Sequence, residues 1–360
     1  MKILIFTQSL SIGGAERVAA LWATGFVDQG HIVQFAIMAG DNVPRTYSIP
    51  DSVNVVSLHS EKKRNISNFI DRFNRTGKII KDFKPDIIIT VLHVQDLPIW
   101  FYTRGKNIKI IQTEHNSFER PSEAPMSKFE RFKKFYRNRL FDAVTVLTQA
   151  DADVIGSKLK HVFVLPNPLA FEPVSNIPPK KKIILAVGRL DVYYTKGFDV
   201  LIKAFAKIQA SCPDWKLRII GSGKENNLNY LKVLAKNEGI EDNMEFVPYT
   251  SDLQPLYQEA EIFCLSSRFE GFGMVLIEAM SQGCACIACD YKGRQKEIIK
   301  SEEYGVICKV GDADELAKKI SSLIDDESYR NRLKGNSPLR AKDYSLPIVM
   351  ENWKSILNEV

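Results

Sequence analysis

The chain has 360 residues and a mass of 40.8 kDa, which exceeds one ordinary domain and favours two. Hydrophobic residues at 45% and charged residues at 26% match an average soluble protein, and no apolar run approaches the roughly 18 residues that a membrane-spanning helix needs. The net charge of +6 suits an anionic partner, but no nucleic-acid-binding motif accompanies it, so we expect no nucleic acid partner.

The first residues, MKILIF, enter a strand-like run directly, without the charged, apolar and cleavage regions of a secretory signal. We therefore expect a cytoplasmic protein. The six cysteines all lie in the second half, mostly in apolar strand-like stretches, as reduced core residues do. Cys284, Cys286 and Cys289 could instead converge on zinc, but no histidine lies nearby to complete a tetrahedral site, and we favour core packing.

Short apolar runs alternate with helical patterns along the first half, which is typical of a parallel sheet with crossover helices. The first strand, at 2–6, precedes a helix from about Ala15 to Gln29. Further strands are predicted at 31–38, 86–92, 108–113 and 143–148. Residues 1–168 are therefore expected to form a Rossmann-like, doubly wound domain.

Several residues with chemical potential directly follow these strands. Gly13 and Gly14 follow the first, where bare backbone amides can approach an anion at the start of a helix. They lack the Gly-x-Gly-x-x-Gly spacing of a dinucleotide dehydrogenase. His93 and His115 also follow strands, although a packed or surface histidine is the alternative for each.

Segment 126–140 is basic, with Glu130 as its single acid and aromatic residues at helical spacing. Such a helix could lie on an anionic membrane, and the alternative is a helix that buries its aromatic residues in the first domain. A second basic stretch spans 61–84. The basic residues of the two stretches are Lys128, Arg131, Lys133, Lys134, Arg137 and Arg139, and Lys62, Lys63, Arg64, Arg72, Arg75, Lys78, Lys81 and Lys84.

Two Asp-x-Asp triplets, at 151–153 and 312–314, could hold a divalent ion against a diphosphate. Both open helical patterns, however, and aspartates at such positions cap exposed amides. We therefore predict capping for both triplets and no metal site.

A proline-rich stretch at 165–182 marks a break in the pattern, and we predict a linker at 169–181. The alternation then restarts, with strands predicted at 182–188, 216–221, 244–249, 262–267 and 284–289. Residues 182–344 should form a second Rossmann-like domain, and 345–360 a terminal helix. The predicted fold is α/β, with two Rossmann-like doubly wound domains facing across a cleft lined by the carboxyl ends of their strands.

The loop after the first strand of the second domain, VGRLDVYYTKG, supplies Arg189 and Lys196. Arginine offers a planar fork of donors and lysine a point charge, a pairing that suits a diphosphate. Two solvated surface cations are the alternative for this loop taken alone.

The segment SSRFEGFGMVLIEAM, at 266–280, contains two glutamates eight positions apart. Its pattern predicts a strand, then a loop with Glu270, then a helix that begins near Met274 and contains Glu278. Free amides at Gly273, Met274 and Val275 would face an anion. Carboxylates accept hydrogen bonds from hydroxyls and repel phosphate, so the whole pattern predicts a nucleoside diphosphate sugar as ligand.

Arg189, Lys196 and the Glu-x7-Glu pair, in this order, resemble the retaining glycosyltransferases of family 4, which have the GT-B fold. The resemblance covers nearly the whole chain, through GGAER (13–17), TEHN (113–116), GSG (221–223) and EII (297–299), and is strongest over 256–280. Arg189 and Lys196 are seven positions apart, where relatives commonly have five, so a longer loop is expected here.

The resemblance implies a function for each matching residue. Residues 1–168 would bind the acceptor and 182–344 the nucleotide sugar, with the terminal helix packed back on the first domain. Arg189 and Lys196 would hold the diphosphate, Glu278 the ribose, and Glu270 the transferred sugar. His115 would reach the sugar and the acceptor, and Glu270, His115, Arg189 and Lys196 would form the catalytic set. The remaining donor-binding residues would be Gly14, Val247, Tyr249, Gly271, Phe272, Gly273, Met274 and Val275.

The same resemblance implies transfer of a hexose or N-acetylhexosamine from a UDP-sugar to a glycan, through a retaining mechanism that needs no metal or other cofactor. The acceptor would be a lipid-linked oligosaccharide in cell-surface polysaccharide synthesis, which favours peripheral contact of 126–140 with the inner face of the cell membrane. A covalent nucleophile remains open as a second role for Glu270. A sugar-nucleotide epimerase on the same fold and a non-catalytic nucleotide-sugar-binding subunit remain open as alternative functions.

Overall fold

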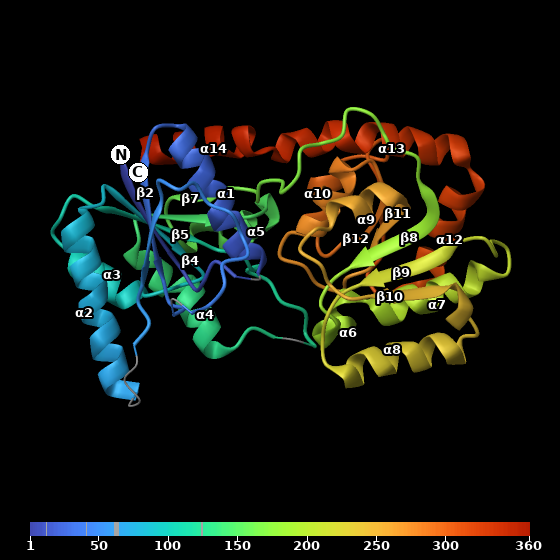
Figure 1. Cartoon of the computed structure of the whole chain (residues 1–360), viewed down its shortest axis with the longest axis horizontal. Helices are drawn as coiled ribbons and strands as arrows, with labels where there is room; N and C mark the ends of the chain where they lie inside the picture. The colour runs from blue at the N-terminus through green and yellow to red at the C-terminus, as the bar shows by residue number, and fades with distance from the viewer. Residues whose placement is uncertain (12, 41, 61–64, 124) are drawn as a thin grey trace. The chain divides into compact units, whose positions relative to one another are not determined.

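The computed structural model describes residues 1–11, 13–40, 42–60, 65–123 and 125–360, and the chain divides into two compact units (Figure 1). Unit 1 contains Met1–Pro168 together with Leu346–Val360, and unit 2 contains Leu169–Ser345. Residues 169–181, expected as a linker, therefore belong to unit 2. Each unit has its own sheet, and every described strand pair in both sheets is parallel.

The sheet of unit 1 has the strand order β3-β2-β1-β4-β5-β6-β7. Its inner strands are buried apolar runs because helices cover both faces, as parallel sheets require. β3 and β7 were not predicted; both are short and lie at the sheet edges, where their residues are only partly buried. The strands are β1 (Lys2–Thr7), β2 (Ile32–Ile37), β3 (Asn54–Ser57), β4 (Ile87–Val91), β5 (Lys109–Thr113), β6 (Ala143–Val146) and β7 (Val162–Val164).

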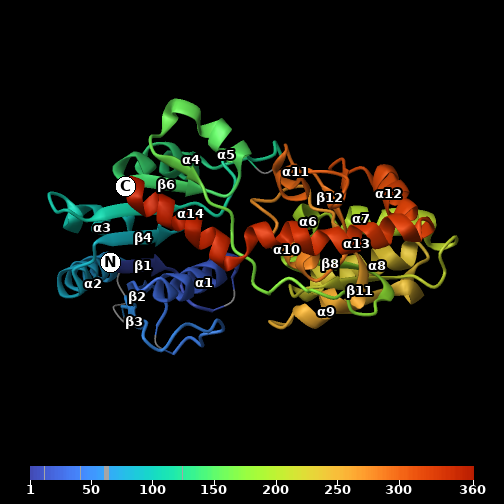
Figure 2. The same cartoon turned by 90° about the horizontal axis from the view of Figure 1, so that it is seen from above.

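The helices of unit 1 include one from the far end of the chain, α14, which lies against α1 (Figure 2). The buried Trp353 of α14 makes edge contacts with Trp22 and Phe26 of α1, with ring centroids 5.1 and 5.4 Å apart. The helices are α1 (Gly14–Asp28), α2 (Asn65–Phe83), α3 (Asp96–Thr103), α4 (Lys128–Phe135), α5 (Gln149–Ile155) and α14 (Leu346–Glu359), and a 3₁₀ helix, η1, spans Arg137–Leu140.

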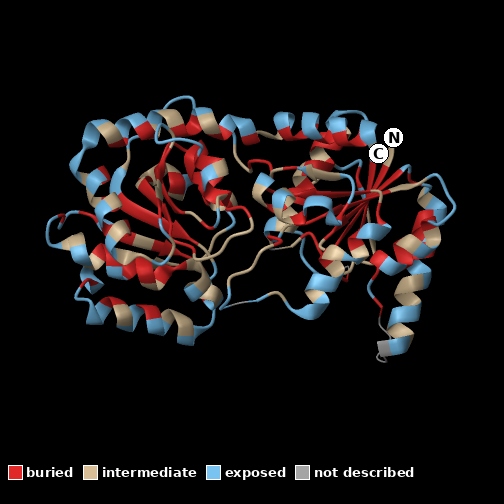
Figure 3. Cartoon of the chain, turned by 180° about the vertical axis from the view of Figure 1, so that it is seen from behind, coloured by how far each residue is buried: buried red, intermediate tan, exposed pale blue. Residues whose placement is uncertain are grey.

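The sheet of unit 2 has the strand order β10-β9-β8-β11-β12-β13. Its inner strands form the buried centre of the unit in Figure 3, whereas the edge strand β10 is only half-buried. All six cysteines are buried and free, as predicted. The strands are β8 (Lys181–Val187), β9 (Lys216–Ile220), β10 (Met244–Val247), β11 (Ala260–Leu265), β12 (Ala285–Cys289) and β13 (Val306–Cys308). The helices are α6 (Tyr193–Lys196), α7 (Phe198–Gln209), α8 (Glu225–Asn237), α9 (Gln254–Glu259), α10 (Met274–Ser281), α11 (Arg294–Ile299), α12 (Ala313–Asp325) and α13 (Glu327–Ala341).

Both sheets have a point where the strand order changes direction, between β1 and β4 in unit 1 and between β8 and β11 in unit 2. At such a point the loops at the carboxyl ends of the two neighbouring strands leave on opposite faces and open a crevice, where α/β proteins bind ligands. The predicted fold class is thus confirmed as two parallel, Rossmann-like sheets. Ligand sites are expected at the carboxyl ends of β1 and β4 in unit 1 and of β8 and β11 in unit 2.

Candidate functional site

The loops that follow β8 and β11 contain the cations and carboxylates predicted in unit 2. Arg189 comes two residues after β8 and is exposed, and Lys196 is the last residue of α6. The longer loop between them is taken up by a 3₁₀ turn at Leu190–Val192 and by the single turn of α6. Compact local structure therefore accommodates the unusual spacing.

Lys196 and Glu270 form a direct ion pair. The Nζ atom of Lys196 lies 2.6 Å from Oε1 of Glu270, and the Ser267 hydroxyl donates to the same oxygen over 2.7 Å. The side chains of Lys196 and Glu270 are 21% and 13% exposed, so the pair is largely shielded from water. The prediction assigned the two residues to different parts of a ligand and did not foresee that they would contact each other.

Gly197 fixes the approach of these two loops. Its backbone is left-handed, with φ of 65°, and a Cβ there would lie 2.0 Å from the carbonyl oxygen of Ser266. The Ser266 hydroxyl in turn donates to the carbonyl of Lys196 over 2.8 Å. Only glycine permits this contact, which holds Lys196 beside the loop that contains Glu270.

Arg268 is a supporting residue that the sequence did not point to. Its guanidinium donates two hydrogen bonds to Asp199, each of 2.7 Å, and one to the carbonyl of Tyr194. It also lies 3.9 Å from the centre of the Tyr194 ring. Arg268 therefore ties the β11 loop to α6 and to the start of α7, on either side of Lys196.

Helix α10 begins at Met274, as predicted, with Gly273 in the left-handed conformation just before it. The first amides of such a helix have no partner within the helix and carry positive partial charge. Met274 and Val275 are half-buried, as is Gly271, whereas the Phe272 ring is buried against Tyr344 at 5.7 Å between centroids. Phe272 can therefore offer a ligand its backbone and not its ring.

Glu278 lies inside α10 and is buried, where Oε2 accepts a 2.9 Å hydrogen bond from the Tyr257 hydroxyl. Val247 and Tyr249 lie at the end of β10 and just beyond it, and both are half-buried. The Tyr249 amide donates to the Ser222 hydroxyl over 3.2 Å, which links it to the Gly-Ser-Gly turn after β9. All three residues thus stay candidates for ribose and base binding.

Two predicted residues lie in unit 1. Gly14 is exposed and opens α1. The His115 ring lies 5.6 Å from that of Trp22, its Nε2 is 3.3 Å from the Thr113 hydroxyl, and its buried Nδ1 has no partner among the described residues. Burial lowers the pKa of His115 to about 4, so the ring is neutral at pH 7. The roles of Gly14 and His115 stay predictions.

His93 lies in a buried ionic cluster at the carboxyl ends of β4 and β5. Its Nδ1 is 2.8 Å from Asp96 and its Nε2 is 2.6 Å from Glu114. Lys134 lies 3.5 Å from Glu114, and Arg137 lies 3.6 Å from Asp96. This cluster was not predicted, because its members come from three separate segments of the chain, at 93–96, at 114 and at 134–137.

The ionic cluster shifts two pKa values. Burial alone would lower the pKa of His93, but the hydrogen bonds that its ring donates to the Asp96 and Glu114 carboxylates, together with their negative charge, outweigh burial and raise the pKa to about 9. Burial alone would raise the pKa of Glu114, but Lys134 and His93 hold it at about 2. His93 is therefore a cation and Glu114 an anion at neutral pH.

Capping is confirmed for one Asp-x-Asp triplet and is wrong for the other. The Asp312 side chain accepts from the Glu315 amide at the start of α12. Thr148, not Asp151, caps α5, and the Asp151 carboxylate accepts from the Ser117 hydroxyl and the Phe118 amide instead. No group of side chains suited to a metal ion occurs among the described residues.

The basic segment 126–140 forms α4 and η1, and one of its six cations is not on the surface. Lys134 is buried, and its ammonium donates to the carbonyls of Asn116 and Ser117 over 2.6 and 2.9 Å. Phe129, Phe132 and Tyr136 are exposed, so the alternative to membrane contact, a helix that buries its aromatic residues in the first domain, does not hold for these three. In the stretch 61–84, Lys62, Lys63 and Arg64 lie outside the described residues.

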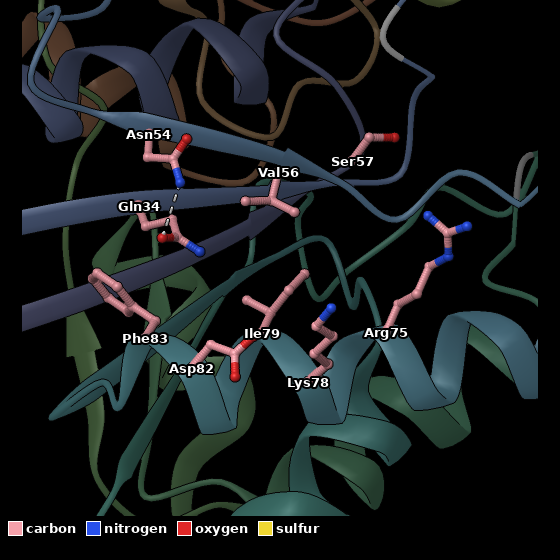
Figure 4. A pocket seen from close by; sticks show the side chains of 9 residues that line it. All are labelled: Gln34, Asn54, Val56, Ser57, Arg75, Lys78, Ile79, Asp82 and Phe83. Atoms are coloured by element: carbon pink, nitrogen blue, oxygen red, sulfur yellow. Dashed lines mark hydrogen bonds between the residues drawn. The ribbon is translucent and has the colours of Figure 1, made fainter.

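A pocket of about 690 Å³ lies between β2, β3 and α2 in unit 1 (Figure 4). A 3.4 Å hydrogen bond from Asn54 to Gln34 crosses the two strands at its edge. Lys78 and Asp82 line the opposite wall on α2, so charges of both signs face the space. None of the predicted site residues borders this pocket, and we assign it no role.

The paired sheets and the loops of unit 2 define a glycosyltransferase of the GT-B architecture. Sucrose-phosphate synthase from Thermosynechococcus elongatus has the same fold, with a TM-score of 0.83 at 19% identity over 99% of this chain and 98% of that one. The model of Glycosyltransferase Family 4 matches residues 12–171, and that of Glycosyl transferases group 1 matches residues 170–340. The chain belongs to this family of glycosyltransferases.

Curated relatives match over the full length. An uncharacterized glycosyltransferase of Haemophilus influenzae is 30% identical over 364 residues, with 99% of both chains covered. An enzyme of Campylobacter jejuni is 27% identical over 369 residues, covering 100% of this chain and 99% of its own. That enzyme is an alpha-1,4-N-acetyl-D-galactosaminyltransferase whose name gives its acceptor as a diphosphate-undecaprenol-linked glycan.

Proposed function

We propose that the protein transfers a hexose or N-acetylhexosamine from a UDP-sugar to a lipid-linked oligosaccharide in cell-surface polysaccharide synthesis. The main support is the partly buried Lys196–Glu270 pair at the direction change of the unit 2 sheet, together with the exposed Arg189, which follows β8 by two residues. The lipid-linked acceptor is supported by the name of the Campylobacter jejuni relative, which matches the chain from end to end.

In this proposal the donor lies along the carboxyl edge of β8, β11 and β10. Arg189, Lys196 and the free amides at the start of α10 bind the diphosphate, because they place positive charge where the leaving group becomes negative. Glu270 accepts hydrogen bonds from the hydroxyls of the transferred sugar. Glu278 binds the ribose, which requires that a ribose hydroxyl join or replace the Tyr257 hydroxyl now bonded to it.

The proposed mechanism is retaining and uses no metal ion or other cofactor. The acceptor hydroxyl attacks from the face that the diphosphate leaves, and a phosphate oxygen takes its proton. In this mechanism no protein side chain has to act as the base. Lys196 and Arg189 then supply the positive charge that stabilises the departing nucleotide. Glu270 accepts hydrogen bonds from Lys196 and Ser267, which fix its carboxylate. In this proposal it therefore binds the sugar hydroxyls and does not act as a covalent nucleophile.

The test is a melting experiment followed by a transfer assay. A UDP-sugar at a hundredfold its dissociation constant should stabilise the protein by about 2.7 kcal/mol, while GDP- and ADP-sugars give smaller shifts. Incubation with the stabilising donor should then yield a glycan extended with retained anomeric configuration, as NMR of the product shows. No stabilisation by any sugar nucleotide would refute the donor site, and a converted donor without an extended glycan would indicate an epimerase.

We also propose that α4 and η1 contact the inner face of the cell membrane. Phe129 is 66% and Phe132 53% exposed, and the basic residues Lys133 and Arg139 accompany them. No described helix is long and apolar enough to cross a bilayer. The contact should appear as co-sedimentation with anionic vesicles that is at least halved in the Phe129→Ser/Phe132→Ser variant. Val233, an exposed apolar residue on α8 of unit 2, provides the control: Val233→Ser should leave co-sedimentation unchanged.

A further inference from the structure

A second pocket, of about 330 Å³, lies at the direction change of the unit 1 sheet. Its walls come from α2, from residues 93–98 directly after β4, and from η1. The volume falls at the lower end of the range of about 300 to 1,000 Å³ that small-molecule sites occupy. The pocket is therefore a separate site from the Lys196–Glu270 pair, on a different sheet.

The charged groups at this pocket have an excess of positive charge. His93, Lys134 and Arg137 are the cations of the ionic cluster, and Asp96 and Glu114 are its two carboxylates. Asp96 lines the pocket, but the contacts to His93 and Arg137 neutralise it. Of the cluster, only His93, Asp96 and Arg137 line the pocket, so one positive charge is left over and the pocket is suited to an anion.

Arg72 adds a second positive charge from α2. It lines the pocket, and its buried Nε–H has no hydrogen-bond acceptor among the residues that the structure describes. A buried donor without an acceptor costs free energy, and a ligand oxygen would supply the missing partner. Arg72 and Arg137 approach from different elements, so an anion between them would be held by two guanidinium groups.

The backbone beside the pocket is strained. Leu92, His93 and Gln95 all have positive φ, of 56°, 61° and 59°, although none is glycine. Such conformations cost free energy and persist where the surrounding structure enforces them, often at binding sites. Here the turn places His93 between its two carboxylates.

The mouth of the pocket is apolar. Phe69 of α2 and Leu97 of α3 line it and are 54% and 44% exposed. Ile70 and Phe101 continue this exposed apolar surface on the same two helices. A ligand that fits both parts has a phosphate group for the pocket and an apolar chain for the rim.

We infer that this pocket binds the diphosphate of a lipid-diphosphate-linked acceptor, held by Arg72 and Arg137 while the lipid lies over Phe69 and Leu97. The inference rests on the proposed function, because it names the part of the acceptor that unit 1 recognises. In this inference the charged part of the site takes the diphosphate group, and a soluble diphosphate compound shares that chemistry.

The first experiment measures binding of inorganic pyrophosphate by calorimetry in excess UDP, so that the Arg189 and Lys196 site is occupied. Arg72→Gln and Arg72→Gln/Arg137→Gln should bind pyrophosphate about 10- to 100-fold more weakly than the unmodified protein. Arg75→Gln is the matched control, because Arg75 lies one turn further along α2, pairs with Asp71 and is 48% exposed. A melting curve without ligand confirms that each variant is folded, and Arg72→Gln leaves the ionic cluster intact.

The second experiment measures KM for the same glycan linked either to a lipid diphosphate or to an alkyl group without phosphate. A KM rise in Arg72→Gln for the diphosphate-linked glycan alone assigns the pocket to the acceptor. Weaker pyrophosphate binding with both KM values unchanged supports the anion site and assigns it to a soluble diphosphate. Pyrophosphate binding that is absent from the unmodified protein, or equal in all variants, overturns the inference. If the unmodified protein transfers sugar to neither glycan, the proposed function is refuted. The calorimetry would still show whether the pocket binds pyrophosphate.

Discussion

Replacing Lys196 with alanine is expected to lower kcat for sugar transfer by about 100- to 1,000-fold, the effect typical of removing one group that stabilises charge in the transition state. The ammonium of Lys196 is the partly buried cation nearest to Glu270 in the proposed donor site. Without it, negative charge on the departing diphosphate meets only Arg189 and backbone amides. The kcat with a saturating UDP-sugar, measured by release of UDP, checks this expectation.

The control for this variant is Lys203→Ala. Lys203 is exposed on α7, seven residues beyond Lys196. The Lys203→Ala substitution therefore removes the same charge from unit 2 but leaves the Glu270 loop unchanged. Its kcat should stay within about twofold of the unmodified enzyme. Full activity of Lys196→Ala, or an equal loss in both variants, would show that the proposed diphosphate site is misassigned.

The fold class could be predicted because a buried parallel sheet leaves a strong pattern in the sequence. Strands such as Ile87–Val91 are covered on both faces and read as continuous apolar runs between helices. The strands that the pattern missed, β3, β7 and β13, have three or four residues and lie at the edges of their sheets. An edge strand has fewer neighbours to bury, so its composition differs little from that of a loop.

The candidate site could be predicted only in part. Loops after strands were identified from sequence, and the pairing of β8 with β11 then brings Lys196 to Glu270 across 74 positions of chain. The resemblance supplied the residues, but not the ion pair between them or the brace formed by Arg268 and Asp199. Such contacts depend on strand order and side-chain geometry, which local patterns do not encode.

The ionic cluster around His93 illustrates the same limit. His93 was noted as a histidine after a strand, where a packed or surface role is the alternative. Its significance comes from Glu114 after β5 and from Arg137 in η1, which the fold brings to one place. No spacing in the sequence relates these three residues. The cluster nevertheless has a consequence for stability that can be measured.

The free energy of unfolding of unit 1 should fall as the pH rises from about 6.5 to 9. The pKa of His93 is about 9 in the folded protein and its ordinary value is 6.5, so between these values the folded chain keeps a proton that the unfolded chain has lost. The stabilisation is complete below 6.5 and disappears above 9. A shift of this size corresponds to as much as about 3 kcal/mol at 1.36 kcal/mol for each pKa unit.

Urea unfolding followed by tryptophan fluorescence measures this effect mainly in unit 1, because Trp22, Trp100 and Trp353 lie there and Trp215 alone lies in unit 2. His93→Gln is the matched variant, since other groups that titrate near pH 9 affect both proteins equally. The difference in unfolding free energy between the two should shrink as the pH rises through 9. A constant difference across this range would mean that His93 is not held as a cation. The excess of positive charge at the pocket of unit 1 would then come from Arg72 and Arg137 without a contribution from His93.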